Sequence, residues 1–208
     1  MTTPDLKIAA LLSSRLCHDL ISPVGAICNG LEVLRDEEDP EMKAHAMTLI
    51  EASAEQASAR LQFARIAFGA AGSAGAEIEL GDALALTQNI LPRGKVTLDW
   101  QLVNKMVSKD MVKLLLNLVL IAMDCIPRGG TLTVVGDLPA GVPYEVRAKG
   151  TKARLGADVK TALFESVALD ACDSRQIQPV FTKMIAAALK VQLGVQEAEE
   201  VVLFRVAA

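Results

Sequence analysis

Aromatic residues are scarce in this chain of 208 residues: they make up 3% of it, with one tryptophan and one tyrosine. Alanine and leucine are abundant instead, which favours helix. An excess of positive charge is also missing, because 25 acidic residues outnumber 21 basic ones and give a net charge of −4. Since a nucleic-acid-binding protein needs a basic surface to neutralise phosphates, this balance argues against that class.

Long hydrophobic runs are missing too. The longest apolar stretch, Leu114 to Met123, is interrupted by Asn117 and is far shorter than the roughly 18 residues that span a bilayer. The first residues, Met1–Lys7, lack the charged segment and apolar run of a signal peptide. We therefore expect a cytoplasmic protein that does not interact with membranes.

Cysteine and histidine are too sparse and too scattered for a metal site. The four cysteines form no C-x-x-C pair, and no histidine lies near them at the spacing of metal ligands. We expect buried thiols in a reducing compartment and no metal bound by this chain. The cysteines are Cys17, Cys28, Cys125 and Cys172.

The first seventy residues contain two apolar patterns with helical spacing. Between them Asp36–Glu41 forms an acidic turn, in which Pro40 stands where it can open a second helix. A short turn between two such helices makes an antiparallel hairpin. The apolar positions are Leu12, Leu16, Leu20, Val24, Ile27, Leu31 and Leu34 in the first helix, and Met47, Ile50, Ala54, Ala57, Leu61, Ala64 and Phe68 in the second.

A hairpin alone cannot cover both sides of these apolar seams. Two hairpins can do so by pairing into a four-helix bundle, so we expect a homodimer through this region. The alternative is that the rest of the chain covers the hairpin within one molecule.

The chain after the hairpin has a different pattern. Small, flexible residues at 69–76 indicate a linker. We place this linker at 71–76, between domains at 1–70 and 77–208. Strands grouped with helices, alternating only partly, predict an α+β sandwich. The expected elements are helices at 81–91, from Ser108 to about 126, at 156–167 and at 177–193, and strands at 95–103, 131–136, 144–148 and 201–206.

The first helix carries a histidine on its outer side. His18 lies two residues from both Leu16 and Leu20, which places it opposite these apolar residues and facing solvent. A solvent-facing imidazole can act as a nucleophile near neutral pH. Asp19 follows directly, and Pro23 interrupts the helix five residues after the histidine. Proline has no N–H, so it frees the carbonyl of Asp19 and should bend the helix.

The segment His18-Asp19-Leu20-Ile21-Ser22-Pro23 resembles the H-box of sensor histidine kinases, in which histidine is followed by an acid and by a proline five residues later. The continuation Val24–Leu31 is similar to one subfamily, the ChpT-type histidine phosphotransferases. This resemblance covers essentially the whole chain. It implies a dimeric hairpin that carries the phosphoryl group on His18, joined to a domain that resembles the kinase ATPase domain.

The same resemblance implies that this second domain has lost its nucleotide site. Residues 111–134 resemble the helix and strand in which active kinases place an asparagine on Mg²⁺, but here that position is Ile121, which cannot bind a hard cation. The adenine-binding acid is missing from Ala148–Arg154, and the lid glycines are missing from Gln176–Ala186. Asn117 does not replace the missing ligand, since many kinases also have asparagine there.

Without ATP, the phosphoryl group must come from another protein. The resemblance implies a donor aspartyl phosphate on the receiver domain of a hybrid histidine kinase, and acceptor aspartates on the receiver domains of response regulators. Mg²⁺ is then expected on the receiver, so that this chain needs no cofactor and mainly supplies positioning. His18 is the catalytic residue, with Asp19 and Pro23 orienting it. Helical spacing places the docking residues around it at Ser14, Arg15, Ile21, Ser22, Gly25 and Asn29.

Two other functions fit the sequence less well. One is an ATP-dependent histidine kinase with an aberrant pocket. The other is a dimeric scaffold or anti-activator that binds a partner through the hairpin without chemistry. The second histidine, His45, has neither a following acid nor a proline after it, and we interpret it as surface.

Overall fold

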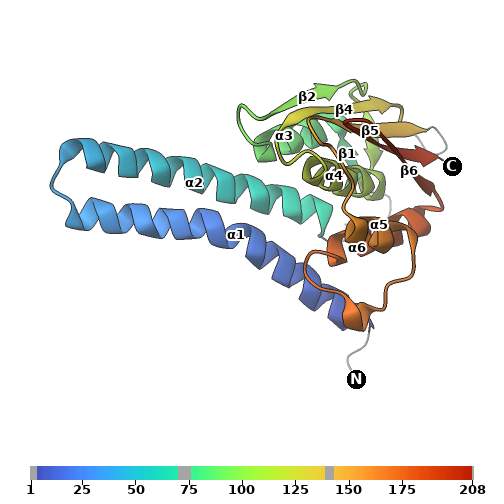
Figure 1. Cartoon of the computed structure of the whole chain (residues 1–208), viewed down its shortest axis with the longest axis horizontal. Helices are drawn as coiled ribbons and strands as arrows, with labels where there is room; N and C mark the ends of the chain where they lie inside the picture. Colours follow the sequence, from blue (N-terminus) through green and yellow to red (C-terminus); the bar gives the residue numbers. More distant parts are fainter. Residues whose placement is uncertain (1–3, 70–75, 139–142, 208) are drawn as a thin grey trace.

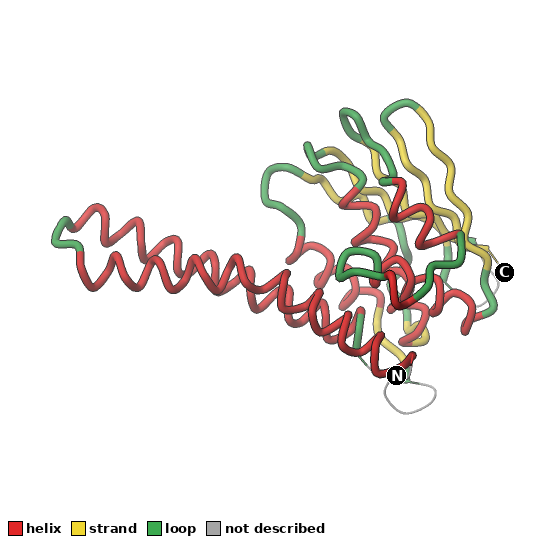
Figure 2. The backbone as a smooth tube through the Cα atoms, turned by 60° about the horizontal axis from the view of Figure 1, so that its bottom comes forward, coloured by secondary structure: helices red, strands yellow, loops and turns green. Residues whose placement is uncertain are grey.

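The structure, a computed structural model, describes residues 4–69, 76–138 and 143–207. Two long helices, α1 (Pro4–Asp36) and α2 (Pro40–Ala67), form an antiparallel hairpin that extends away from the rest of the molecule (Figures 1 and 2). The turn between them ends at Asp39, whose side chain accepts a hydrogen bond from the N–H of Glu41. Proline is tolerated at the first helical position, so the sequence Asp39-Pro40 starts α2 where we expect it.

A glycine and a proline shape the packing of α1 against α2: the glycine permits a close approach, and the proline bends α1. Gly30 is buried, and a Cβ atom at this position would come within 2.6 Å of Cγ1 of Ile50. Pro23 is buried inside α1, which bends part-way along its length (Figure 1). An interior proline removes a backbone hydrogen bond and bends a helix, so we attribute the bend to Pro23.

The row of α2 that faces α1 differs by one residue from part of the predicted seam. Met47, Ala54 and Leu61 are exposed in the single chain. The neighbouring row is buried or half-buried in their place: Ala46, Ser53, Arg60 and Ala67. The sequence pattern favours the row of Met47 because it is the more apolar of the two, whereas the buried row contains Ser53 and Arg60.

The second part of the chain is an α+β sandwich, as predicted (Figure 1). A five-stranded mixed sheet has the order β2-β4-β5-β7-β6, in which β2 and β4 are parallel and the other neighbours are antiparallel. A separate two-stranded sheet pairs β1 with β3. The strands are β1 (Glu77–Glu79), β2 (Val96–Trp100), β3 (Met106–Ser108), β4 (Gly130–Gly136), β5 (Tyr144–Lys149), β6 (Gln192–Ala198) and β7 (Val201–Ala207).

The helices of this domain pack between the sheet and the hairpin (Figure 1). Ser108 caps α4 as predicted, because its hydroxyl accepts from the N–H of Met111. The predicted helix at 177–193 is too long: it ends at Leu189, and Lys190 adopts a left-handed backbone with φ of 57°. Residues 192–198 form β6 instead. The helices are α3 (Leu80–Ile90), α4 (Lys109–Asp124), α5 (Ala157–Phe164), the short 3₁₀ helix η1 (Leu169–Ala171) and α6 (Ile177–Leu189).

The end of the hairpin is buried in the core of the second domain. Phe63 and Ala67 of α2 are almost fully buried in the cluster that contains most of α4. Asn117 of α4 is fully buried, and its amide nitrogen donates to the carbonyl oxygens of Ala67, at 2.8 Å, and Lys113, at 2.9 Å. Gln178 of α6 donates to the backbone and side-chain oxygens of Asn117. This amide cluster joins α2, α4 and α6, and we infer that it holds the hairpin and the sandwich together.

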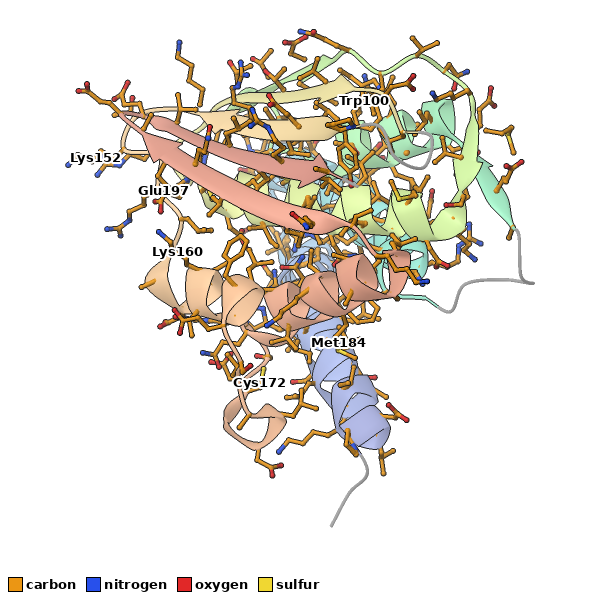
Figure 3. All side chains as sticks on the ribbon, turned by 90° about the vertical axis from the view of Figure 1, so that its right-hand side faces the viewer. Trp100, Lys152, Lys160, Cys172, Met184 and Glu197 are labelled. Atoms are coloured by element: carbon orange, nitrogen blue, oxygen red, sulfur yellow. The ribbon has the colours of Figure 1, made fainter. Side chains whose placement is uncertain are left out.

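A second contact holds the beginning of α1. Ile8 packs against Cys172 and Ile177, and Lys7 pairs with Asp170 at 2.8 Å. Figure 3 shows Cys172 in the loop region near η1, below α6, which carries Met184. The stretch between α5 and α6 therefore lies against α1. The predicted linker at 71–76, apart from Ala76, lies outside the described residues.

The cysteines follow the expectation only in part. All four cysteines are free thiols, but only Cys125 and Cys172 are buried, so the expected burial is wrong for Cys17 and Cys28. These two lie on the sides of α1 that the hairpin leaves open. Burial raises the pKa of the Cys125 thiol to about 12.

Among the described residues, no helix has the length and apolarity needed to cross a bilayer.

Candidate phosphotransfer site

His18 projects into solvent from the middle of α1. Its side chain keeps 67% of its accessible surface, which agrees with the side of the helix predicted from the sequence. Nδ1 of the ring lies 3.4 Å from Oδ1 of Asp19. A carboxylate oxygen facing the ring can only accept, so we assign the ring proton to Nδ1. Nε2 is then left as the nitrogen with a free lone pair.

Asp19 is held in place by a second side chain of the same helix. Arg15 donates through Nε to Oδ2 of Asp19 at 3.0 Å, an ion pair between residues one helical turn apart. The two side chains retain only 17% and 25% of their accessible surface, so this pair is better shielded from water than a typical surface ion pair. Arg15 therefore fixes the carboxylate that contacts His18.

Arg60 of α2 binds the backbone at the same place. Its Nη1 donates to the carbonyl oxygen of Asp19 at 2.9 Å. In a regular helix that oxygen would accept from the N–H of residue 23, and Pro23 has none. The sequence predicts the freed carbonyl, and the structure shows that an arginine from the other helix satisfies it.

The second domain also contributes a charge near this site. Asp124 is the last residue of α4, and removal of its carboxyl from water raises its pKa. The charge of Arg15 lowers this pKa and the charge of Asp19 raises it further. The end of α4 thus lies near the ion pair of α1. Sequence reasoning missed both Arg60 and Asp124, because neither belongs to the H-box.

The predicted docking residues fall into two groups. Ser14, Ile21, Ser22 and Asn29 are exposed, and a Cβ atom at Gly25 would meet nothing within 4 Å. Arg15 is different because its guanidinium is turned toward Asp19. We call the exposed group the His18 face: Ser14, His18, Ile21, Ser22, Gly25 and Asn29.

The positions that resemble a nucleotide site have other partners. Ile121 is 1% exposed and packs in the core. The amide of Asn117 is occupied by the backbone of α2 and α4 and by Gln178. Arg154, in the segment where the resemblance would place an adenine-binding turn, donates its backbone N–H to the carbonyl of Cys125. These groups are used to hold the domain together.

Comparison with known proteins gives the family. Residues 80–201 match the family model of the histidine phosphotransferase C-terminal domain. The protein phosphotransferase ChpT of Brucella abortus (strain 2308) is 40% identical over 205 residues, which cover 98% of this chain and 97% of that protein. The chain belongs to the histidine phosphotransferase family.

The structure of this histidine phosphotransferase agrees with that assignment. A solved bacterial phosphotransferase is 36% identical and superimposes with a TM-score of 0.87, covering 99% of this chain and 98% of that one. The resemblance found in the sequence is thereby confirmed, and the chain is a phosphotransferase of a phosphorelay.

Proposed function

We propose that this histidine phosphotransferase accepts a phosphoryl group on Nε2 of His18 from the aspartyl phosphate of one receiver domain and passes it to the aspartate of another. The observation that supports this best is the geometry of His18: an exposed ring whose Nδ1 faces a fixed carboxylate, which leaves Nε2 as the free nitrogen. The donor would be the receiver of a hybrid histidine kinase and the acceptors those of response regulators, in the cytoplasm.

The chemistry needs no external proton. The lone pair of Nε2 attacks phosphorus, the P–N bond forms, and the P–O bond to the donor aspartate breaks and releases a carboxylate. The ring keeps the proton on Nδ1 and gains positive charge, which the carboxylate of Asp19 stabilises. In the second half the acceptor carboxylate attacks phosphorus and the neutral imidazole leaves. Mg²⁺ would be bound by the receiver, so the task of this chain is alignment.

The phosphoryl group would not come from ATP. Ile121 is buried where a kinase needs an oxygen ligand for Mg²⁺, and Asn117 is engaged by protein groups. We expect no rise in the melting temperature with millimolar ATP and Mg²⁺, because a ligand shifts unfolding only if it binds the folded state. A shift of several degrees, or labelling of the chain by ATP alone, would instead support the aberrant kinase.

The functional unit would be a homodimer. In the single chain, apolar side chains remain exposed along one side of both helices: Val24 and Leu31 on α1, and Met47 and Leu61 on α2. They continue into an apolar groove of about 790 Å³ lined by Leu12, Leu16, Leu61, Phe68, Phe181 and Met184, among others. The heptad spacing of Met47, Ala54 and Leu61 favours a second hairpin as the occupant. The second domain covers the start of α1, but it leaves the apolar stripe formed by Val24, Leu31, Met47 and Leu61 exposed.

A charge in this stripe should separate the dimer. We expect Leu61→Glu to convert a species of twice 22.1 kDa into one of 22.1 kDa, because the interface would bury an unpaired carboxylate. Light scattering after size-exclusion chromatography measures the mass. Val103→Glu, at an apolar residue of similar chemistry that is 74% exposed in the second domain, is the matched control and should leave the mass unchanged. A native chain that is monomeric at micromolar concentration contradicts this part of the proposal.

Gly25 offers a way to block the partner without damage to the fold. Leucine at this position meets no atom of the chain within reach of its Cβ and has a helix propensity about 0.5–1 kcal/mol better than glycine. We expect Gly25→Leu to leave the melting temperature equal or higher and to slow transfer from a phosphorylated receiver at least about tenfold. Stopped-flow or gel assays with labelled receiver measure the rate. Unchanged transfer would remove Gly25 from the docking surface.

The direct test of the proposal is reconstitution with two purified receiver domains. One receiver is phosphorylated with a labelled small phosphodonor and freed of it, and the second is added with Mg²⁺ but without ATP. We expect label to reach the second receiver only when this chain is present. A scaffold without chemistry would bind the receivers and leave the label where it was.

A further inference from the structure

The least expected contact of the site is the one between Arg60 and the backbone of Asp19. Arg60 stands in the row of α2 that faces α1, where the other members are the small residues Ala46, Ser53 and Ala67. A long charged side chain in such a row costs packing and desolvation. Its hydrogen-bond partner among the described residues is a single backbone oxygen, which Nη1 reaches at 2.9 Å.

That oxygen needs a partner because of Pro23. A partly buried carbonyl without a hydrogen bond is costly, and the residue that would normally supply the N–H is the proline. The arginine gives a charge-assisted hydrogen bond, which is stronger than the backbone bond that is missing. Arg60 therefore satisfies the oxygen that Pro23 leaves free, one residue after the histidine, and so stabilises the bent helix.

The contact also completes the support of the catalytic ring. Asp19 is now fixed twice: its carboxylate by Arg15, and its carbonyl by Arg60. Nδ1 of His18 rests against the other oxygen of this carboxylate. Since Arg60 comes from α2, the orientation of His18 depends on the packing of the two helices, not on α1 alone.

We propose that Arg60 is a positioning residue for phosphoryl transfer, which acts by replacing the backbone hydrogen bond that Pro23 removes and thereby holds Asp19 against Nδ1 of His18. This inference rests on the proposed role of His18. Two residues on different helices are thereby coupled: Arg60 is needed because residue 23 is proline.

A double-mutant cycle tests that claim. Arg60→Met keeps most of the aliphatic stem and removes all donors, whereas Pro23→Ala restores the N–H that can donate to the carbonyl of Asp19. We expect Arg60→Met to slow transfer from a phosphorylated receiver by about 10- to 100-fold, since a small misplacement of a catalytic group has effects of this size. In the Pro23→Ala background the same change should cost less than about twofold. Equal losses in both backgrounds would overturn the proposal.

The state of the imidazole gives a second readout, which a purely structural role would not change. The chain has only two histidines, so ¹⁵N-labelled rings give two sets of signals, and the exposed His45 serves as an internal reference. At a pH where both rings are neutral, we expect His18 to be protonated mainly on Nδ1 in the native chain. In Arg60→Met its tautomers should become mixed, as in a free imidazole. Native signals from His18 in that variant would contradict the proposal.

Two more variants keep the test independent of folding and of the proposed function. Arg60→Lys retains a donor and should recover the rate to within about threefold of native; if it is as slow as Arg60→Met although folded, the carbonyl contact is not what matters. Arg35→Gln, at an exposed arginine of α1 that pairs with its neighbour Asp36, should transfer normally. If His18→Ala still transfers, the proposed function fails; if it does not, but Arg60→Met transfers at the native rate with native ring signals, only this inference fails.

Discussion

His18→Ala should abolish the passage of phosphate between receiver domains while leaving a folded protein of unchanged mass. The ring is 67% exposed and its contact with Asp19 is long, at 3.4 Å, so its removal leaves no cavity and breaks no strong bond. In the proposed mechanism all covalent chemistry passes through Nε2, and no other residue of the His18 face is a nucleophile of this kind. We expect a loss of at least about a thousandfold, the effect of removing a covalent nucleophile. The assay is label transfer between two receivers without ATP.

The second histidine supplies the control. His45 lies exposed on α2, and His45→Ala should transfer at the native rate. Circular dichroism and light scattering should be the same for both variants and for the native chain. Substantial transfer by His18→Ala would mean either that another residue carries the phosphoryl group or that the chain only brings receivers together.

Asn117→Leu should destabilise the whole chain, although this residue lies far from the chemistry in the sequence. The change removes two hydrogen bonds, to the carbonyls of Ala67 and Lys113, and deprives Gln178 of an acceptor. All of these groups are buried, so they cannot turn to water. Leaving buried polar groups unpaired costs about 1–3 kcal/mol each, and we expect a total loss of about 2–4 kcal/mol in the free energy of unfolding. Urea titration followed by circular dichroism measures it.

Gln62→Leu is the matched control for this change. Gln62 also donates a side-chain hydrogen bond, to Ser58, but on the exposed side of α2. Its replacement should change the free energy of unfolding by less than about 0.5 kcal/mol. If both variants lose equally little, the amide cluster does not hold the hairpin to the sandwich.

Most of the hairpin and of the site could be predicted because local chemistry determines them. The acidic turn with Pro40, the helical spacing of leucines and the cap at Ser108 act within a few residues, and the phase of α1 alone turns His18 outward. The sequence favours Met47 over Ala46 as the buried row, because the row of Ala46 also contains Ser53 and Arg60. The more apolar row of Met47 is expected to face another copy.

Arg60 and β6 were missed for different reasons. The proposed role of Arg60 depends on its contact with an oxygen of the other helix. Two signals could have found it: an arginine in a row of small residues, and its place roughly opposite Asp19 when residues are counted outward from the turn at Glu37–Asp39. For β6, the apolar pattern of α6 runs on past Leu189, and the left-handed backbone at Lys190 carries neither glycine nor asparagine to mark the end of the helix.

The central claim is that the phosphoryl group resides on Nε2 of His18 and comes from a receiver aspartate. Phosphorus NMR of the native chain, after incubation with a phosphorylated receiver domain and without ATP, tests it most directly. We predict one new resonance, at the shift of histidine phosphorylated on Nε2, which disappears on addition of a second, unphosphorylated receiver and never forms in His18→Ala. A resonance from phosphorylated Nδ1 or from another residue, or phosphorylation that occurs only with ATP, would contradict the account.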